Sequence, residues 1–183
     1  MKRTEHRALG LQLACVLPSL YLITVKFHKD QSCMSTMEQK LLREAILEAN
    51  LGLAAGGIPI GSVLADANGG IVSRGHNLRV QTGDPTAHAE VVCLRNAGRR
   101  TDWHQLTLVS TLSPCIMCTG ASLLYKIPRI IIGEHTTFLG AEDLFAANDI
   151  QCVVMNDPEC IELMRTFIRD NPSLWNEDIG VVK

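Results

Sequence analysis

The sequence is poor in aromatic residues and has little net charge. Phe, Trp and Tyr together make up 4% of its 183 residues, and the formal net charge is −2. Few aromatic side chains leave few platforms on which the bases of a single strand can stack. A chain without an excess of Lys and Arg also lacks the electrostatic footprint of nucleic-acid binding. We therefore expect no nucleic-acid partner.

Several common functional patterns are also missing. The sequence contains no internal repeat, low-complexity tract, phosphate-binding glycine loop, dinucleotide fingerprint or Ser-His-Asp pattern. Apolar residues make up 46% and charged residues 20% of the chain, which is ordinary for a globular protein and excludes a disordered or collagenous chain. The length provides one domain, or one domain with an appendage.

The N-terminal part is the unusual region. A basic start precedes residues 9–25, which carry no charge. This is the outline of a signal peptide, but Gln12 and Pro18 interrupt the run, which is short for a membrane span and has no clear cleavage site after it. A targeting peptide, a membrane anchor, a disordered extension and a start codon set too far upstream stay open. We divide the chain into an N-terminal extension, residues 1–36, and a globular domain, residues 37–183.

Cysteine is more frequent than expected, with an odd count of seven. Only Cys115 and Cys118 form a close pair, and in a chain that can build its own core such a pair indicates metal or redox chemistry rather than a disulfide framework. We expect the other cysteines of the globular domain to be small buried side chains. This usage favours a cytoplasmic location and is also compatible with a nuclear one. Export or membrane association through the N-terminal segment stays open.

Hydrophobic periodicity predicts alternating helices and strands. We expect helices over residues 38–55, 84–98, 113–126 and 157–170, and strands over 58–65, 71–77, 106–111, 129–133 and 150–155. Ser113 is the expected N-cap of the third helix, with Pro114 at its first position, and Asp157 is that of the fourth. A turn over residues 66–70 joins the first two strands as an antiparallel hairpin, and the later strands are expected to be parallel. The pattern predicts a three-layer α/β/α fold with a five-stranded mixed sheet.

The side chains able to do chemistry gather in two short motifs. His88 and Glu90 lie in DPTAHAE, and Cys115 and Cys118 lie in PCIMC. The two cysteines are one turn apart at a predicted helix N-terminus, where the helix dipole favours the thiolate form that binds metal. With His88 they provide one imidazole and two thiolates, which leaves the fourth tetrahedral position open as in a catalytic zinc site.

Glu90 is the residue that favours catalysis over a structural role for the metal. Two positions after His88, its carboxylate can take a proton from water and return it to a substrate without itself binding the metal. A structural zinc site would need a fourth protein ligand, for which His76 and Cys93 are candidates, and a zinc-stabilised interaction module without activity is the non-enzyme alternative. The arrangement H-x-E followed by P-C-x-x-C is the signature of the zinc nucleobase deaminases.

Longer stretches resemble the fungal-type cytosine deaminases of the zinc-dependent cytidine and deoxycytidylate deaminase superfamily. The segments GGIPIGSVL, RGHN, TLSPCIMCTGASLLYKIPRIIIGE and LWNEDIG carry this resemblance, which extends over residues 37–180. It implies one Zn²⁺ per subunit on His88, Cys115 and Cys118, Glu90 as the proton shuttle, and a homodimer.

The same resemblance implies a substrate site for a small nucleobase. It places Asn77 and Asp178 against the polar edge of the pyrimidine and makes Ile60, Phe138 and Trp175 its apolar walls, the last two as parts of a lid. From the residues alone, Asn77 could be a turn residue, Asp178 an exposed acid, and the two aromatics core or interface residues.

One residue departs from the family pattern. Fungal enzymes typically have Gly between the catalytic His and Glu, where this chain has Ala89, which we expect near the substrate. In this respect DPTAHAE looks more like guanine and tRNA adenosine deaminases. The expected activity is zinc-dependent hydrolysis of cytosine to uracil and ammonia in pyrimidine salvage, with another base or nucleoside as the alternative. No membrane partner is expected unless the N-terminal segment is an anchor.

Overall fold

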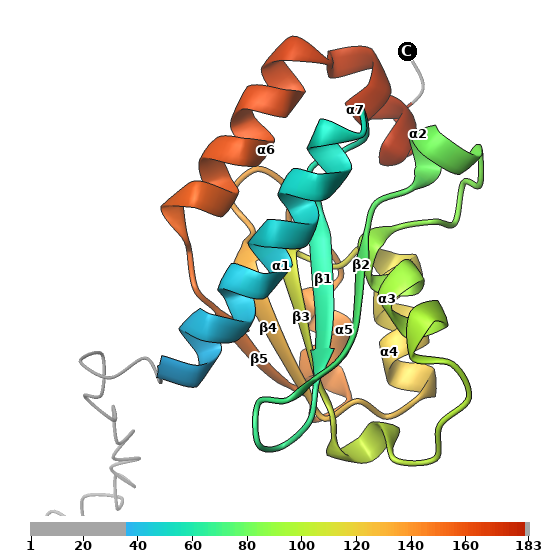
Figure 1. Ribbon diagram of the computed structural model, residues 1–183, viewed down its shortest axis with the longest axis vertical. Coiled ribbons are helices and arrows are strands. Elements are labelled where there is room, and N and C mark those ends of the chain that lie inside the picture. The colour runs from blue at the N-terminus through green and yellow to red at the C-terminus, as the bar shows by residue number, and fades with distance from the viewer. Residues whose placement is uncertain (1–35, 182–183) are drawn as a thin grey trace, which may run out of the picture. The chain divides into compact units, whose positions relative to one another are not determined.

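A computed structural model describes residues 36–181 and shows helices on both faces of a five-stranded sheet (Figure 1). The strands are β1 (Gly61–Ala65), β2 (Ile71–His76), β3 (Thr107–Leu112), β4 (Arg129–Glu134) and β5 (Gln151–Val154). The helices are α1 (Thr36–Ala54), α2 (Arg79–Thr82), α3 (Ala89–Ala97), η1 (Trp103–Gln105), α4 (Ile116–Leu124), α5 (Glu142–Ala147), α6 (Pro158–Asp170) and α7 (Pro172–Asp178). The predicted three-layer α/β/α class is confirmed.

The sheet is mixed, in the order β2-β1-β3-β4-β5. β1 is antiparallel to both β2 and β3, whereas β3, β4 and β5 are mutually parallel, as predicted. The β1–β2 turn is held by Asp66, whose Oδ1 accepts hydrogen bonds from the backbone N–H groups of Asn68 at 2.8 Å and Gly70 at 2.9 Å. A side chain that satisfies turn amides explains why this segment closes a hairpin.

Alternation along the central strands divides the core into two layers. On β4, Ile130 and Ile132 pack in the cluster that contains residues of α3 and α5, whereas Ile131 packs in the cluster that contains residues of α1 and α6. Successive side chains of a strand point to opposite faces of the sheet, so a continuous apolar run requires helices on both faces. Figure 1 shows α1 and α6 on one face of the sheet and α3 and α4 towards the other.

The contact between α1 and β1 requires a glycine. A Cβ at Gly61 would lie 2.0 Å from the backbone oxygen of Ala45 and 2.4 Å from the backbone nitrogen of Ala49. β1 also begins later than predicted, at Gly61 rather than Ile58, because Pro59 has no N–H to donate and the Ile60 N–H bonds to Ile58 O at 2.8 Å. Ile60 is thereby placed just before the strand, next to the site described below.

The N-terminal extension predicted for residues 1–36 lies almost entirely outside the described residues, as do Cys15 and Cys33. The division of the chain at this point stays a prediction. Within residues 36–181, no helix is long and apolar enough to cross a membrane.

Candidate active site

The candidate site lies at the carboxyl ends of the parallel strands β3 and β4. β3 leads directly into Ser113, Pro114 and Cys115, and β4 leads into the loop that carries Phe138. In open α/β sheets this edge is the usual place for a ligand, because the loops that leave neighbouring strands diverge there. A third apolar cluster, which includes Leu112, Phe167 and Trp175, covers this end of the sheet.

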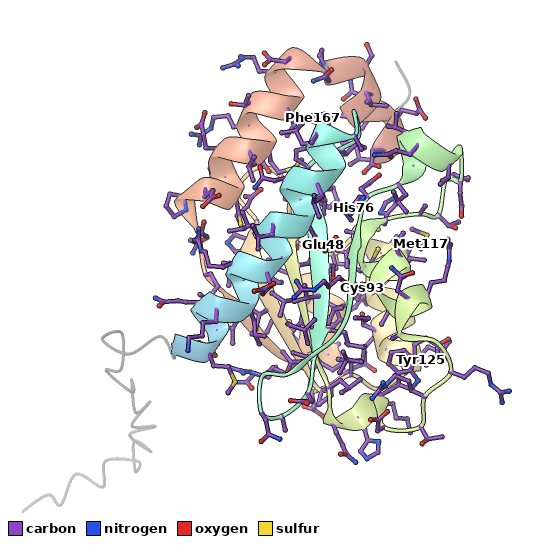
Figure 2. The ribbon with its side chains drawn as sticks, viewed as in Figure 1. Glu48, His76, Cys93, Met117, Tyr125 and Phe167 are labelled. Atoms are coloured by element: carbon purple, nitrogen blue, oxygen red, sulfur yellow. The ribbon has the colours of Figure 1, made fainter. Side chains whose placement is uncertain are left out.

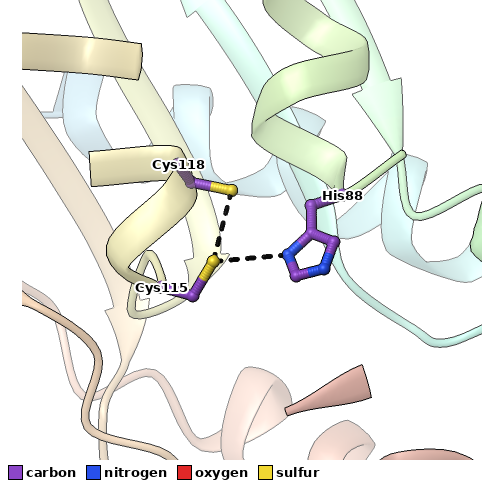
Figure 3. A group of neighbouring side chains, drawn as sticks. All are labelled: His88, Cys115 and Cys118. Carbon is purple, nitrogen blue, oxygen red and sulfur yellow. Dashed lines mark hydrogen bonds between the residues drawn. The ribbon is translucent and has the colours of Figure 1, made fainter. Parts of the chain in front are cut away.

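Three of the predicted residues meet as a group of metal-binding side chains. His88 Nδ1 lies 3.5 Å from Cys115 Sγ, which lies 3.7 Å from Cys118 Sγ (Figure 3). All three ligand atoms lie within 4.8 Å of one another. His88 is the N-cap of α3 and Cys115 the N-cap of α4, so the starts of two helices bring them together.

Both helix starts differ from the sequence prediction. The helix expected from residue 84 begins at Ala89, because Asp84 instead closes a turn in which its Oδ1 accepts a hydrogen bond from Thr86 N at 2.8 Å. Ser113 is not the cap of α4: its N–H bonds to Glu134 O at 2.9 Å in continuation of the sheet, and its hydroxyl donates to Glu142 Oε1 at 2.7 Å. The predictions of these two helix starts were therefore wrong.

The two thiols of the site differ in acidity. The pKa of Cys115 is lowered to about 4, chiefly because Cys118 donates a hydrogen bond to its sulfur and, after an opposing effect of burial, because His88 lies beside it. That same hydrogen bond, followed by burial, raises the pKa of Cys118 well above its usual value. Cys115 is therefore the more acidic of the two thiols, and metal binding requires both sulfurs to lose their protons.

The neighbours of His88 raise its pKa. Burial by itself lowers the pKa of His88, but the hydrogen bond with Cys115 and the charge of Asp178 outweigh it, and the pKa is raised. Asp178 Oδ1 lies 3.9 Å from His88 Nε2. The imidazole therefore lies between a thiolate and a carboxylate, which fixes the orientation of its ring.

Glu90 lies in the first turn of α3 and has a side chain that is almost inaccessible. The residue is 3% exposed, and its Oε1 accepts a hydrogen bond from Ser110 Oγ at 2.9 Å. Burial, and then the nearby charge of Cys115, raise the pKa of Glu90 above its usual value. A carboxyl group with a raised pKa can hold a proton as well as release one, which is the property that a proton shuttle requires.

The donor set fits a zinc ion with an open coordination position. Two thiolates and one imidazole at these separations match the ligand types of catalytic zinc sites. Neither alternative fourth ligand joins them. His76 Nδ1 instead lies 3.0 Å from Glu48 Oε2 (Figure 2), and burial raises the pKa of Cys93 to about 11, which keeps its thiol protonated.

A cavity of about 470 Å³ opens beside these residues. Of the predicted site residues, it is lined by Ile60, His88, Glu90, Cys115, Phe138, Trp175 and Asp178. The rings of Phe138 and Trp175 meet edge to face, with centroids 5.8 Å apart. Because Phe138 lies in the loop after β4 and Trp175 lies in α7, their contact joins the β4 side of the cavity to α7.

Asn77 and Ala89 are close to the site but do not line the cavity. Asn77 is fully buried, and its Nδ2 donates to Asp178 Oδ1 at 3.2 Å. Ala89 is fully buried in the apolar cluster with Ile58 and Trp175. Their contact with a substrate stays a prediction, as do the roles of the other predicted substrate residues.

Sequence reasoning missed two residues that the structure adds to the site. Arg79, at the start of α2, donates from Nη1 to Asp178 Oδ1 at 2.9 Å. Ser113 lines the cavity and accepts a hydrogen bond from Gly140 N at 3.0 Å, which holds the loop after Phe138. The position of Arg79 two residues after Asn77 was the available signal.

Comparison with known proteins agrees with this geometry. The family described as the cytidine and deoxycytidylate deaminase zinc-binding region matches residues 35–134, which include all three zinc-ligand candidates and Glu90. A cytosine deaminase of Candida albicans is 43% identical over 149 residues, which cover 80% of this chain and 99% of that protein. The chain belongs to this zinc-binding deaminase family.

More distant members of the family act on RNA. A tRNA-specific adenosine deaminase of Haemophilus influenzae is 40% identical over 110 residues, which cover 58% of this chain and 64% of that protein. A solved structure from a study of A-to-I editing at the wobble position of transfer RNA superimposes with a TM-score of 0.60 and 26% identity, and the match covers 68% of this chain and 99% of that one. Family membership therefore establishes the zinc-binding deaminase fold, and the substrate depends on the residues around the cavity.

Proposed function

We propose that the protein hydrolyses cytosine to uracil and ammonia. The observation that carries this proposal is a cavity of about 470 Å³ in which His88, Cys115 and Glu90 share a lining with the apolar side chains of Phe138 and Trp175. Small, flat ligands need apolar faces and a few placed polar groups, and a volume of this size is typical of small-molecule sites. The similarity to the cytosine deaminase of Candida albicans supports the same substrate.

The residues of the chain divide the chemistry between them. His88, Cys115 and Cys118 would hold one zinc ion per subunit, which supplies a Lewis acid and makes water nucleophilic near neutral pH. Glu90 would take one proton from the attacking water and pass it to the ring nitrogen of the base. It would then take the second proton, from the hydroxyl left on the ring, and pass it to the departing amine, so that both protons of the water are accounted for. Ser110 orients the Glu90 carboxylate through a hydrogen bond to Oε1.

We assign the orientation of the substrate to cavity residues other than the zinc-ligand candidates and Glu90. Asp178 lines the cavity and can accept hydrogen bonds from a ring N–H or an amine, while Phe138 and Trp175 would cover the faces of the base. Asn77 would act through the carboxylate of Asp178, to which it donates, or by direct contact with the base.

Deamination of another base, or of adenosine in tRNA, is the second candidate. The similarity to tRNA-specific adenosine deaminases and the residue Ala89 between His88 and Glu90 favour it. Two observations weigh against it. The net charge is −2. In addition, the segment LWNEDIG, which resembles cytosine deaminases, contributes Trp175, Asp178 and Ile179 to the cavity. Clustered Lys and Arg would be expected around an RNA site.

A panel of substrates tests the proposal directly. Cytosine, 5-substituted cytosines, cytidine, guanine and a tRNA anticodon stem are each incubated with the zinc-loaded protein, and ammonia release is measured. We expect turnover of cytosine, the substrate named for the Candida albicans relative, and none of cytidine. Turnover of cytidine, guanine or the RNA without turnover of cytosine contradicts the proposal.

We further propose that the protein is a homodimer. Exposed apolar side chains gather on and beside α4, where Ile116 is 69% and Leu124 75% exposed, together with Tyr125 and Leu139. Surfaces of this kind mark interaction sites. Light scattering of the purified protein should give twice the mass of the chain at micromolar concentration, and a monomer at that concentration contradicts the dimer.

A role in pyrimidine salvage in the cytoplasm is proposed on chemical grounds. Deamination of a free base yields a base that can be reused, which is the definition of salvage. The cysteines within residues 36–181 are all free thiols, as proteins of reducing compartments have.

A further inference from the structure

Arg79 is a buried arginine that connects two distant parts of the chain. It begins α2, three positions after the last residue of β2, and its side chain is 10% exposed. Its Nη1 donates to Asp178 Oδ1 at 2.9 Å, and its Nη2 lies 3.4 Å from Glu177 Oε1. The guanidinium therefore contacts the last two residues of α7, the helix that supplies one side of the cavity.

The contact forms part of a closed ring of three residues. Asn77 Oδ1 accepts a hydrogen bond from Arg79 N at 3.1 Å, and Asn77 Nδ2 donates to Asp178 Oδ1 at 3.2 Å. The Nη1 bond of Arg79 to the same oxygen closes the ring. The donors Asn77 Nδ2 and Arg79 Nη1 both bond to Oδ1 of Asp178, so neither of them engages Oδ2. Asp178 is also one of the residues that line the cavity.

The buried position of the Asp178 side chain is unfavourable for a negative charge unless a positive partner such as Arg79 lies beside it. Its side chain is 3% exposed, and it is the last residue of α7, where the helix dipole disfavours an anion. A buried carboxylate loses its hydration, and a positive partner with hydrogen bonds offsets that loss. Arg79 supplies both the positive charge and a donor in fixed geometry.

Arg79 also has a buried donor without a hydrogen-bond partner, which an arginine with a purely structural role would be expected to avoid. Its Nε is the buried side-chain nitrogen or oxygen without a hydrogen-bond partner in the described part of the chain. Buried donors are almost always paired, so an exception requires an explanation. Here the guanidinium is directed at Asp178 and Glu177 although one of its donors is left unpaired.

We propose that Arg79 is a positioning residue for substrate recognition. It holds the Asp178 carboxylate in one orientation, so that Asp178 can accept hydrogen bonds from the amine edge of a nucleobase. Arg79 itself acts only through Asp178. The inference rests on the proposed function, because it assigns Asp178 to the binding of the base.

Steady-state kinetics of Arg79→Met and Arg79→Lys test this role. Met keeps most of the apolar length and removes the charge, and Lys keeps the charge but loses the fork of donors. We expect KM for cytosine to rise about 10- to 100-fold in Arg79→Met, the range for a hydrogen bond to a charged group, with a smaller rise in Arg79→Lys. We expect kcat to change by less than about 5-fold, because Glu90 and the zinc ligands are untouched. Arg165→Met is the matched control: Arg165 is an exposed arginine paired with Glu162 within α6, and both constants should stay at wild-type values.

A double-mutant cycle with Asp178→Asn separates positioning from a general structural effect. If Arg79 acts through Asp178, Arg79→Met adds less than about 3-fold to the KM of Asp178→Asn. Equal effects of Arg79→Met in both backgrounds, or a wild-type KM in Arg79→Met, overturn the proposal. If Arg79→Met does not fold, as judged by zinc content and thermal melting, the same cycle is run with Arg79→Lys.

The outcome is independent of the identity of the base. If the wild-type protein deaminates a base other than cytosine, the proposed function fails, and the cycle is measured with that base. Non-additive effects of Arg79 and Asp178 on its KM then still support the positioning role, and additive effects still overturn it.

Discussion

Glu90→Gln is expected to lower kcat for deamination by about 10²- to 10⁴-fold, the contribution typical of a general acid–base residue. Gln has the same shape, and its amide oxygen can still accept the hydrogen bond from Ser110 Oγ. It cannot take a proton from water or return one to the leaving amine. The rate of ammonia release from cytosine measures the effect.

Zinc content and thermal stability decide whether the loss is chemical. Because Glu90 is 3% exposed with a raised pKa, replacing its carboxyl by a neutral amide should leave the melting temperature unchanged or slightly higher. Glu48→Gln is the matched control: Glu48 is also a buried carboxylate with a partner, His76, but it lies outside the cavity lining, and its variant should keep wild-type activity. A Glu90→Gln protein that loses its zinc, or that still deaminates at the wild-type rate, contradicts the shuttle role.

Cys118→Ser is expected to abolish both zinc binding and activity. The sulfur of Cys118 is fully buried 3.7 Å from that of Cys115, and a serine hydroxyl is neither soft nor ionised at neutral pH. Loss of an outer-shell partner alone costs a metal site about 10- to 100-fold in affinity, so loss of a ligand should lower zinc affinity by more than about 100-fold. Titration with a zinc-chelating dye measures the affinity, and the assay of ammonia release should find no turnover.

Thermal melting adds an independent readout to this experiment. Because zinc binds the folded site, its loss should lower the melting temperature of Cys118→Ser towards that of chelator-treated wild-type protein. Cys152→Ser, which changes a free cysteine on β5 away from the cavity, should retain zinc and turnover. Full zinc occupancy in Cys118→Ser would mean that another residue completes the site, and the assigned ligand set would be wrong.

The sheet and the candidate zinc site could be predicted from the sequence because both depend on patterns of residues that are close together in the chain. Strand residues such as Ile130 to Ile132 form unbroken apolar runs, which indicate burial on both faces. The pair Cys115 and Cys118 at one-turn spacing has few explanations other than metal or redox chemistry. The cap at Asp157 was also predicted, and its Oδ1 accepts from Glu159 N at 3.0 Å.

The errors arose where a local signal competes with a tertiary contact. Ser113 before Pro114 is a good helix start by sequence, yet the Ser113 N–H continues the sheet by bonding to Glu134 O, and α4 starts at Ile116. Asp84 before Pro85 is similar, but that segment closes a turn and leaves His88 as the cap of α3. In both cases the delayed start moves a metal ligand to the N-cap position, where its side chain is directed at the cavity.

The sequence by itself predicted which residues would hold zinc and move a proton, because their chemistry depends on residue type and on spacing within one or two helical turns. Only the tertiary structure decided which residues contact Asp178. Arg79 and Asp178 are far apart in the chain, and their contact exists because α7 ends beside the segment that follows β2. No local pattern encodes such a contact, since it depends on how the helices pack on the sheet.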